Sequence, residues 1–160
     1  MPLPKHLRPR WRYLAVRIET WPDADPSRKG FQRAVWESAR ALLGDPGSAD
    51  AVLEVLRYRF GGGTGEAVVR VRHGEVSRGR AALACVGSVD GHPIGVRVVG
   101  VSGTIRACEE KYLGETPGDP DHEDVVFGDG TRPAVVRGAA VDVRDGHAFA
   151  GATPIDLEDQ

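Results

Sequence analysis

"AVLEVLRYRFGGGTGEAVVRVR", residues 51–72, joins two runs of alternating apolar and polar residues through a glycine-rich segment. Alternation with a period of two is typical of β-strands that bury one face. A phosphate-binding loop would need a lysine directly after its last glycine and a helix behind it, and this stretch has neither. The stretch therefore predicts a β-hairpin, with strands at 51–60 and 66–72.

Two further strands are expected on either side of this hairpin. They are "RYLAVRIE", residues 12–19, and "HPIGVRVVGVS", residues 92–102. Each of the four strands is apolar at every second position, which predicts one sheet face buried against helices. These positions are Leu14, Val16, Ile18, Leu56, Tyr58, Phe60, Ala67, Val69, Val71, Ile94, Val96 and Val98.

Three helices are expected between and after the strands, at residues 25–45, 74–88 and 104–113. In the first, Asp25 is placed to cap the helix, Pro26 suits its first turn and Gly44 suits its end. The inward-facing residues are expected to be Phe31, Ala34, Val35, Ala39 and Leu42 in the first helix, Val76, Leu83 and Val86 in the second, and Ile105, Cys108 and Tyr112 in the third.

The order strand, helix, strand, strand, helix, strand is that of ferredoxin-like and RRM-like α+β domains. It predicts a four-stranded antiparallel sheet with helices 25–44 and 74–87 on one face. The apolar stripe of the third helix must also be buried, and the second face of the sheet is available for it.

Charge divides the chain into two parts. Residues 1–113 carry 18 Lys and Arg against 12 Asp and Glu, a charge of +6, whereas residues 114–160 carry 3 Arg against 11 Asp and Glu, a charge of −8. We expect an RRM-like domain at 1–113, a Pro/Gly-rich acidic linker at 114–124 and an acidic extension at 125–160. A basic body of this kind indicates an anionic partner.

The acidic extension has strand patterning of its own. Short strands are expected near 125–128, 134–137, 140–143 and 147–150, and Asp145-Gly146 is a hairpin signal. Disorder of the whole extension is the alternative.

On the four core strands, arginines occupy positions that alternate with the apolar ones. A cluster of this kind on one sheet face indicates an anion-binding surface, although solvated positions or a cover by the acidic extension would give the same pattern. The third core strand lacks the aromatic residues on which RRM domains stack bases, so we expect contacts to phosphate and sugar. The arginines are Arg17, Arg57, Arg59, Arg70, Arg72 and Arg97.

The N-terminus adds a basic arm at residues 1–11. Lys5, Arg8, Arg10 and Arg12 are interleaved with Trp11, a composition that suits a flexible nucleic-acid arm. A frayed terminus is the alternative.

In "VSGTIRACEEKYL", residues 101–113, a strand changes into a helix at small residues. Ser102, Gly103 and Thr104 can cap the helix, or expose its N–H groups to an anion with Arg106 one turn in. Local physics favours capping.

Neither catalysis nor metal binding by the protein is expected. The five histidines show no paired ligand spacing, and the carboxylates cluster in the extension, where solvation explains them. No run approaches the roughly 18 apolar residues of a membrane span. Cys85 and Cys108 are expected to be buried thiols in a reducing compartment, which predicts a cytoplasmic protein; a disulfide or reactive pair is the alternative.

"RYLAVRIE", the hairpin and "AALACVGSVDGHPIGVRVVGVSGTIRACEEKYL", residues 81–113, resemble the archaeal ribonuclease P protein component 2 family, which is related to a small eukaryotic subunit of ribonuclease P and MRP. The resemblance covers about residues 5–113 and is most specific at residues 94–113. It implies an RRM-like fold and a non-catalytic subunit of an RNA-based endonuclease that removes 5′ leaders from precursor tRNA.

The resemblance also implies the partners. These are the ribonuclease P RNA, precursor tRNA within the holoenzyme, and protein component 3, in a hetero-oligomer whose chemistry is done by RNA and Mg²⁺. Two other classes of function stay open: a small-molecule-binding ferredoxin-like regulatory domain with its anion site at Ser102–Thr104, and a protein-interaction module.

Overall fold

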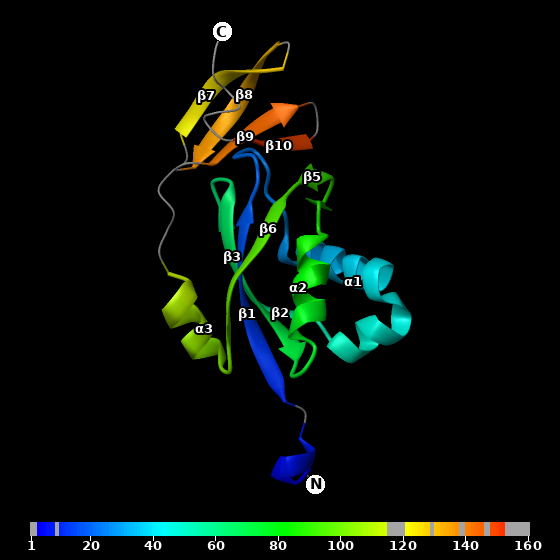
Figure 1. Ribbon diagram of the computed structural model, residues 1–160. Helices are drawn as coiled ribbons and strands as arrows, with labels where there is room; N and C mark the ends of the chain where they lie inside the picture. The colour runs from blue at the N-terminus through cyan, green and yellow to red at the C-terminus, as the bar shows by residue number, and fades with distance from the viewer. Residues whose placement is uncertain are drawn as a thin grey trace. The chain divides into compact units, whose positions relative to one another are not determined.

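The computed structural model of the protein describes residues 3–8, 10–114, 121–128, 130–137, 140–145 and 148–152. The chain divides into two compact units, Met1–Glu115 and Thr116–Gln160. Among the described residues, the first unit contains three α-helices and a four-stranded antiparallel sheet, and the second contains another four-stranded antiparallel sheet (Figure 1). No helix in the described part of the chain has the length and apolar character of a membrane span.

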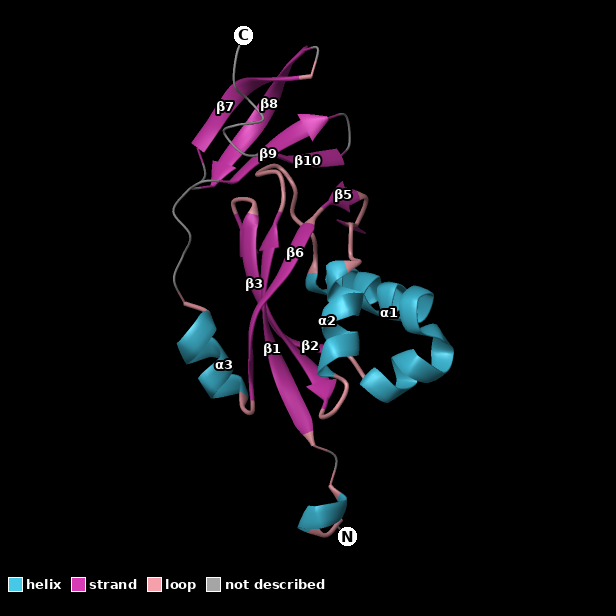
Figure 2. Cartoon of the chain, viewed as in Figure 1, coloured by secondary structure: helices cyan, strands magenta, loops and turns pink. Residues whose placement is uncertain are grey.

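The core sheet has the strand order β2-β3-β1-β6. Helices α1 and α2 pack on its first face and α3 packs on its second face (Figure 2), so the predicted ferredoxin-like α+β fold with an added helix is confirmed. The elements are β1 (Trp11–Glu19), α1 (Arg28–Ala51), β2 (Glu54–Gly61), β3 (Thr64–Arg72), α2 (Val76–Ala84), β6 (Gly95–Ser102) and α3 (Ile105–Tyr112).

The predicted apolar parity forms the core on the first face. Leu14, Val16 and Ile18 are at most 1% exposed and belong to one cluster with Phe31 and Val35 of α1. Burial of such side chains contributes about 1.5–3 kcal/mol each. The inward residues predicted on β3, and Ile94, Val96 and Val98 at the fourth strand, also belong to this cluster or pack against it, so these positions are confirmed. Beyond Val98 the pairing of β6 with β1 shifts register, and Val101 packs on this core while Val99 packs on the second face.

Strand β2 departs from the predicted alternation. Its pairing with β3 shifts register between Val55 and Arg57, which makes Leu56 the extra residue of a β-bulge. Val55 is consequently 3% exposed and lies in the core, whereas Leu56 is only half-buried and outside the core cluster. The prediction that Leu56 faces inward was wrong. An extra residue in a strand makes the residues before it and the residues after it alternate in opposite senses, so Val55 and not Leu56 points into the core.

Helix α1 begins later than predicted. Ser27, and not Asp25, caps it, because the Ser27 side chain accepts a hydrogen bond from the Gly30 backbone N–H at 2.9 Å. The short strands β4 (Ser88–Val89) and β5 (His92–Pro93) form a hairpin near this helix start.

Gly44 breaks α1 instead of ending it. Its φ of 72° and ψ of 174° are not helical, yet a second helical segment continues to Ala51, where a strand was predicted. Leu42 is 48% exposed, and Leu43 packs against the core instead. The inward position predicted for Leu42 was therefore wrong.

The glycine-rich segment forms the predicted hairpin turn. Gly61 pairs with Thr64, and Gly62 and Gly63 between them have φ values of 61° and 84°. Two-residue hairpin turns favour such left-handed positions, which glycine occupies without strain.

The two cysteines differ in burial. Both are free thiols, and Cys108 in α3 is fully buried as predicted, but Cys85 directly after α2 is exposed. Helix α2 ends at Ala84, earlier than predicted, which leaves Cys85 on the surface.

The second unit contains the tail sheet, with strand order β10-β9-β8-β7. All four predicted strands exist, although β7 begins at Asp121, inside the stretch expected to be a linker, and the turn at residues 146–147 lies outside the described residues. Val125, Ala134, Val141 and Val143 form its buried cluster. The strands are β7 (Asp121–Phe127), β8 (Gly130–Arg137), β9 (Ala140–Asp145) and β10 (Ala148–Ala152).

Candidate nucleic-acid interface

Strand register places the predicted arginines on the second face of the core sheet. Arg17 lies opposite Arg97 of β6 and opposite Glu66 of β3, and Arg57 lies opposite Val68, which is buried beneath α3. The same register brings Arg59, Arg70 and Arg72 to this face.

Helix α3 covers part of that face and so divides the arginines. Cys108, Ala15 and Val68 form a buried cluster, against which Tyr112 and Leu113 pack. Cys108 and Tyr112 of the stripe predicted for α3 therefore meet the sheet as expected, whereas Ile105 is half-buried and lies outside both clusters of this unit. The arginines therefore do not form one continuous exposed surface, because the apolar contact between α3 and the sheet lies between them.

Four of these arginines are paired with glutamates. Arg59 binds Glu66 at 2.8 Å, Arg17 lies 3.7 Å from the same carboxylate, and Arg57 lies 3.5 Å from Glu109 of α3. Arg70 binds Glu54 of β2 and also stacks on the Trp11 ring, with 4.0 Å between the guanidinium carbon and the ring centroid. A phosphate would have to compete with a carboxylate at each of these positions.

Glu66 joins β1, β3 and the end of α3. Its side chain is only 11% exposed, and it also accepts a hydrogen bond from the Gly114 N–H at 3.3 Å. Arg17 donates in addition to the Tyr112 carbonyl at 3.3 Å. Because a buried carboxylate needs such partners, these contacts fix α3 on the sheet and serve structure.

Three further arginines lie near the ends of strands, Arg10 and Arg12 where β1 begins and Arg72 where β3 ends. By register Arg72 lies on the second face, whereas Arg12 lies opposite the core residue Val71 and therefore on the first face. Within the described part of the chain, Arg10, Arg12 and Arg72 form no ion pair, and Trp11 pairs with Arg72 across the strands. We call Arg10, Arg12 and Arg72 the basic end of the core sheet. Arg97 likewise has no ion pair within the described residues, but it stands apart, opposite Arg17.

The start of α3 adjoins the basic end. The Thr104 hydroxyl accepts a hydrogen bond from the Ala107 N–H at 3.1 Å, so the predicted capping is confirmed and Thr104 performs it. A Cβ built on Gly103 would lie 3.4 Å from Nη1 of Arg12, which places a cation beside the positive end of a helix. Arg106, in the first turn, pairs with Glu110 at 2.8 Å.

The arm residues precede this end in the chain. Lys5 lies in the short 3₁₀ helix η1 (Lys5–Leu7), and Arg8 donates to the Leu3 carbonyl at 2.8 Å. Both side chains are exposed, whereas Arg12, expected on the arm, is the second residue of β1.

Two side chains of the first unit have raised pKa values. Burial raises the pKa of Tyr58 to about 12, with the charges of Asp25 and Asp90 adding to the effect. Burial likewise raises the pKa of the Cys108 thiol to about 11. No group of three or more metal-ligating side chains occurs among the described residues. The basic end thus offers guanidinium groups from both faces of the sheet, which can hold phosphates by charge and by hydrogen bonds.

The order of strands and helices makes this an RRM-like α+β protein. The cations at the basic end make an anionic partner suitable. Residues 12–113 match the Rpp14/Pop5 family, and the chain belongs to this family.

Similar proteins agree with this assignment. The chain is 59% identical over 156 residues to "Ribonuclease P protein component 2" of Halorubrum lacusprofundi and 54% identical over 157 residues to that of Natronomonas pharaonis, with 98% of each chain covered in both cases. It is 35% identical to the protein of the same name from Methanosarcina mazei, over 67% of this chain and 87% of the relative.

Proposed function

We propose that this chain is a protein subunit of ribonuclease P that supports the catalytic RNA, which removes 5′ leaders from precursor tRNA. Membership of the Rpp14/Pop5 family and the names of relatives that cover nearly the whole chain support the assignment to ribonuclease P. The observation that supports RNA binding is the basic end, where Arg10, Arg12 and Arg72 have no ion pair within the described residues.

The proposed contacts are to phosphates. Each arginine that neutralises a phosphate releases condensed counterions, so affinity falls steeply as salt rises. Arg10, Arg12 and Arg72 can do this without losing a protein partner, and Lys5 and Arg8 extend the cationic path along the chain. Arg17, Arg57, Arg59 and Arg70 contribute less, because each would first have to leave a glutamate.

In this proposal the protein performs no chemical step. Magnesium ions held by the RNA supply the chemistry, and the protein binds and orients the RNA. The proposed assembly is a cytoplasmic hetero-oligomer with the ribonuclease P RNA and protein component 3, and it engages precursor tRNA as a particle.

Reconstitution tests the proposal. The cognate RNA and the other protein subunits are assembled with and without this chain, and cleavage of 5′-labelled precursor tRNA is followed at fixed magnesium and salt. We expect faster cleavage with the chain present and none by the chain alone. Cleavage by nuclease-treated protein without RNA would contradict a non-catalytic role, and an unchanged rate with the chain present would contradict the proposal as a whole.

A further inference from the structure

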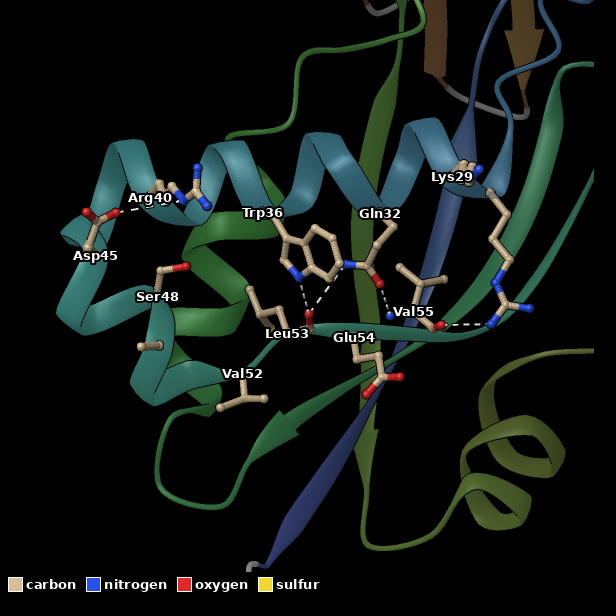
Figure 3. A pocket seen from close by; sticks show the side chains of 12 residues that line it. Lys29, Gln32, Trp36, Arg40, Asp45, Ser48, Val52, Leu53, Glu54 and Val55 are labelled. Atoms are coloured by element: carbon tan, nitrogen blue, oxygen red, sulfur yellow. Dashed lines mark hydrogen bonds and ion pairs between the residues drawn. The ribbon is translucent and has the colours of Figure 1, made fainter.

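A groove of about 1020 Å³ lies between α1 and the start of β2 (Figure 3). Its wall on the helix side is a single face of α1 that carries Arg28, Gln32, Trp36 and Arg40 at a spacing of four residues. The chain turns at Gly44, so the second segment of α1 contributes further groove residues, among them Asp45 and Ser48. The sequence pattern gave no sign of this groove, because the turn within α1 creates it.

Side chains of α1 occupy the free edge of β2. Gln32 donates to the Leu53 carbonyl at 3.4 Å and accepts from the Val55 N–H at 2.7 Å, as a neighbouring strand would. Arg28 donates to the Val55 carbonyl at 2.9 Å. An edge protected in this way cannot take a further strand without losing these bonds, so an occupant of the groove packs by its side chains.

Trp36 is the prominent feature of the groove. Trp36 is 51% exposed, yet its Nε1–H donates to the Leu53 carbonyl at 2.7 Å, which fixes the orientation of the indole. A rigid, half-exposed tryptophan loses little conformational entropy on binding, and tryptophan is enriched among residues that dominate protein interfaces.

The charges around Trp36 favour a protein over RNA. Asp45 lies 3.8 Å from Arg40, beside the apolar side chains of Val52 and Leu53. Glu54 also lines the groove, although its carboxylate is bound to Arg70. An apolar centre with a rim of both signs is typical of protein interfaces, whereas RNA-binding surfaces are predominantly positive. At the other end, Arg28 and Lys29 have no carboxylate partner within the described residues.

We propose that this groove docks an amphipathic segment of another protein subunit, with an apolar side chain seated on Trp36 and a carboxylate facing Arg28 and Lys29. The inference rests on the proposed function, because it takes the partner from the same particle. The proposed contact with a protein therefore uses the groove, which contains none of the three arginines of the basic end.

A photo-cross-linking amino acid at position 40 tests the proposal in the reconstituted particle. Position 42 is the matched control, because Leu42 is also exposed on α1 but does not line the groove. We expect an adduct from position 40 that protease destroys and ribonuclease leaves intact, and little from position 42. An RNA adduct at position 40, or no adduct there, would overturn the proposal.

Two variants test the chemistry of the contact. Lys29→Glu reverses an exposed charge that has no hydrogen bond among the described residues, and Trp36→Ala removes the anchor; each should weaken association with the cross-linked subunit at least about tenfold. Leu42→Ala should change it less than twofold. Unchanged association of Lys29→Glu and Trp36→Ala would overturn the inference alone, whereas failure of the unmodified chain to join the particle would overturn the proposed function as well.

Discussion

Asp90 holds the start of α1 through Ser27. Its carboxylate accepts hydrogen bonds from the Ser27 backbone N–H at 3.0 Å and from the Ser27 hydroxyl at 2.9 Å, while that hydroxyl accepts from Gly30. These bonds, the backbone one first, hold the pKa of Asp90 below its ordinary value. The β4–β5 hairpin thereby provides a negative charge at a helix N-terminus, where it is stabilising.

Replacing Asp90 by Asn should lower the free energy of unfolding by about 0.5–1 kcal/mol at pH 7. Asn tolerates the φ of 52° at this position, so the change removes the charge and not the turn. Because the folded-state pKa is lowered, the stabilisation is complete above the unfolded pKa of about 4 and is lost as pH falls through the folded value. Urea unfolding at pH 7 and pH 3 measures this.

The control for Asp90 is Asp23→Asn, an exposed carboxylate for which no hydrogen bond or ion pair is seen among the described residues. It should leave stability unchanged at both pH values. A difference between wild type and Asp90→Asn that persists undiminished at pH 3 would contradict the role assigned to the charge.

Gly100 leaves room for Tyr112. A Cβ built on Gly100 would lie 2.4 Å from three carbons of the Tyr112 ring, so a side chain there would displace α3 from the sheet. Gly100→Ala should cost about 1–3 kcal/mol of stability by overpacking. Gly87→Ala, whose Cβ meets nothing within 4 Å, is the control.

A double variant separates this collision from other effects. In a Tyr112→Ala background, Gly100→Ala should cost much less than it does alone, because the ring it collides with is absent. Chemical denaturation measures the loss in the free energy of unfolding for each variant. If the losses of the two single variants simply add in the double variant, Gly100 is needed for its backbone conformation and not for the space that it leaves to the Tyr112 ring.

The two cysteines should react with alkylating reagents at very different rates. At pH 8 iodoacetamide should modify exposed Cys85 readily, and Cys108 only after unfolding, because burial and a pKa of about 11 keep its thiol protonated. Mass spectrometry of the digested protein, with and without urea, measures both rates. Equal rates in the native protein would mean that α3 detaches from the sheet.

The fold could be predicted well from the sequence, because strands and helices are recognised by the spacing of their apolar residues. Strand alternation, the turn glycines at 62–63 and the positions of Cys108 and Tyr112 in the stripe on α3 are local patterns that the structure preserves. The bulge at Leu56 and the broken helix at Gly44 were missed, because both depend on how a segment fits its neighbours. Asp90 was missed for the same reason, since its partner Ser27 is distant in sequence.

The arginine face shows the same limit. Parity alone brought the arginines together, and it also placed Glu66 among them on β3, a signal that could have been used. The pairing of Glu54 with Arg70 was hidden by the bulge in β2, and that of Glu109 with Arg57 by the unknown rotation of α3 about its axis. The charge pattern therefore predicted a cationic face but not which of its cations are paired.

We expect the first unit to fold without the second. Its two buried clusters draw only on residues before Gly114, and the tail sheet has a cluster of its own. A chain that ends after Gly118 should keep its helix and strand content and melt in one cooperative transition. Circular dichroism at increasing temperature measures this, and a broad, non-cooperative melt would mean that the tail sheet completes the first unit.

The final prediction separates paired from unpaired arginines in RNA binding. Two matched triple variants are compared, Arg10, Arg12 and Arg72 to Gln, and Arg57, Arg59 and Arg70 to Gln. Each lost phosphate contact reduces the slope of log affinity against log salt by about 0.7–0.9, so the first triple should reduce it by about 2–3. The second should reduce it by less, because three glutamates already neutralise these side chains.

Filter binding of the cognate RNA at several salt concentrations gives both slopes, and thermal melts show whether each variant is folded. An equal reduction by both triples would mean that RNA displaces the glutamates and uses the second face as well as the basic end. A larger reduction by the second triple would move the interface from the basic end to the region beside α3. Unchanged slopes for both, with folded proteins, would mean that neither set of arginines contacts phosphate.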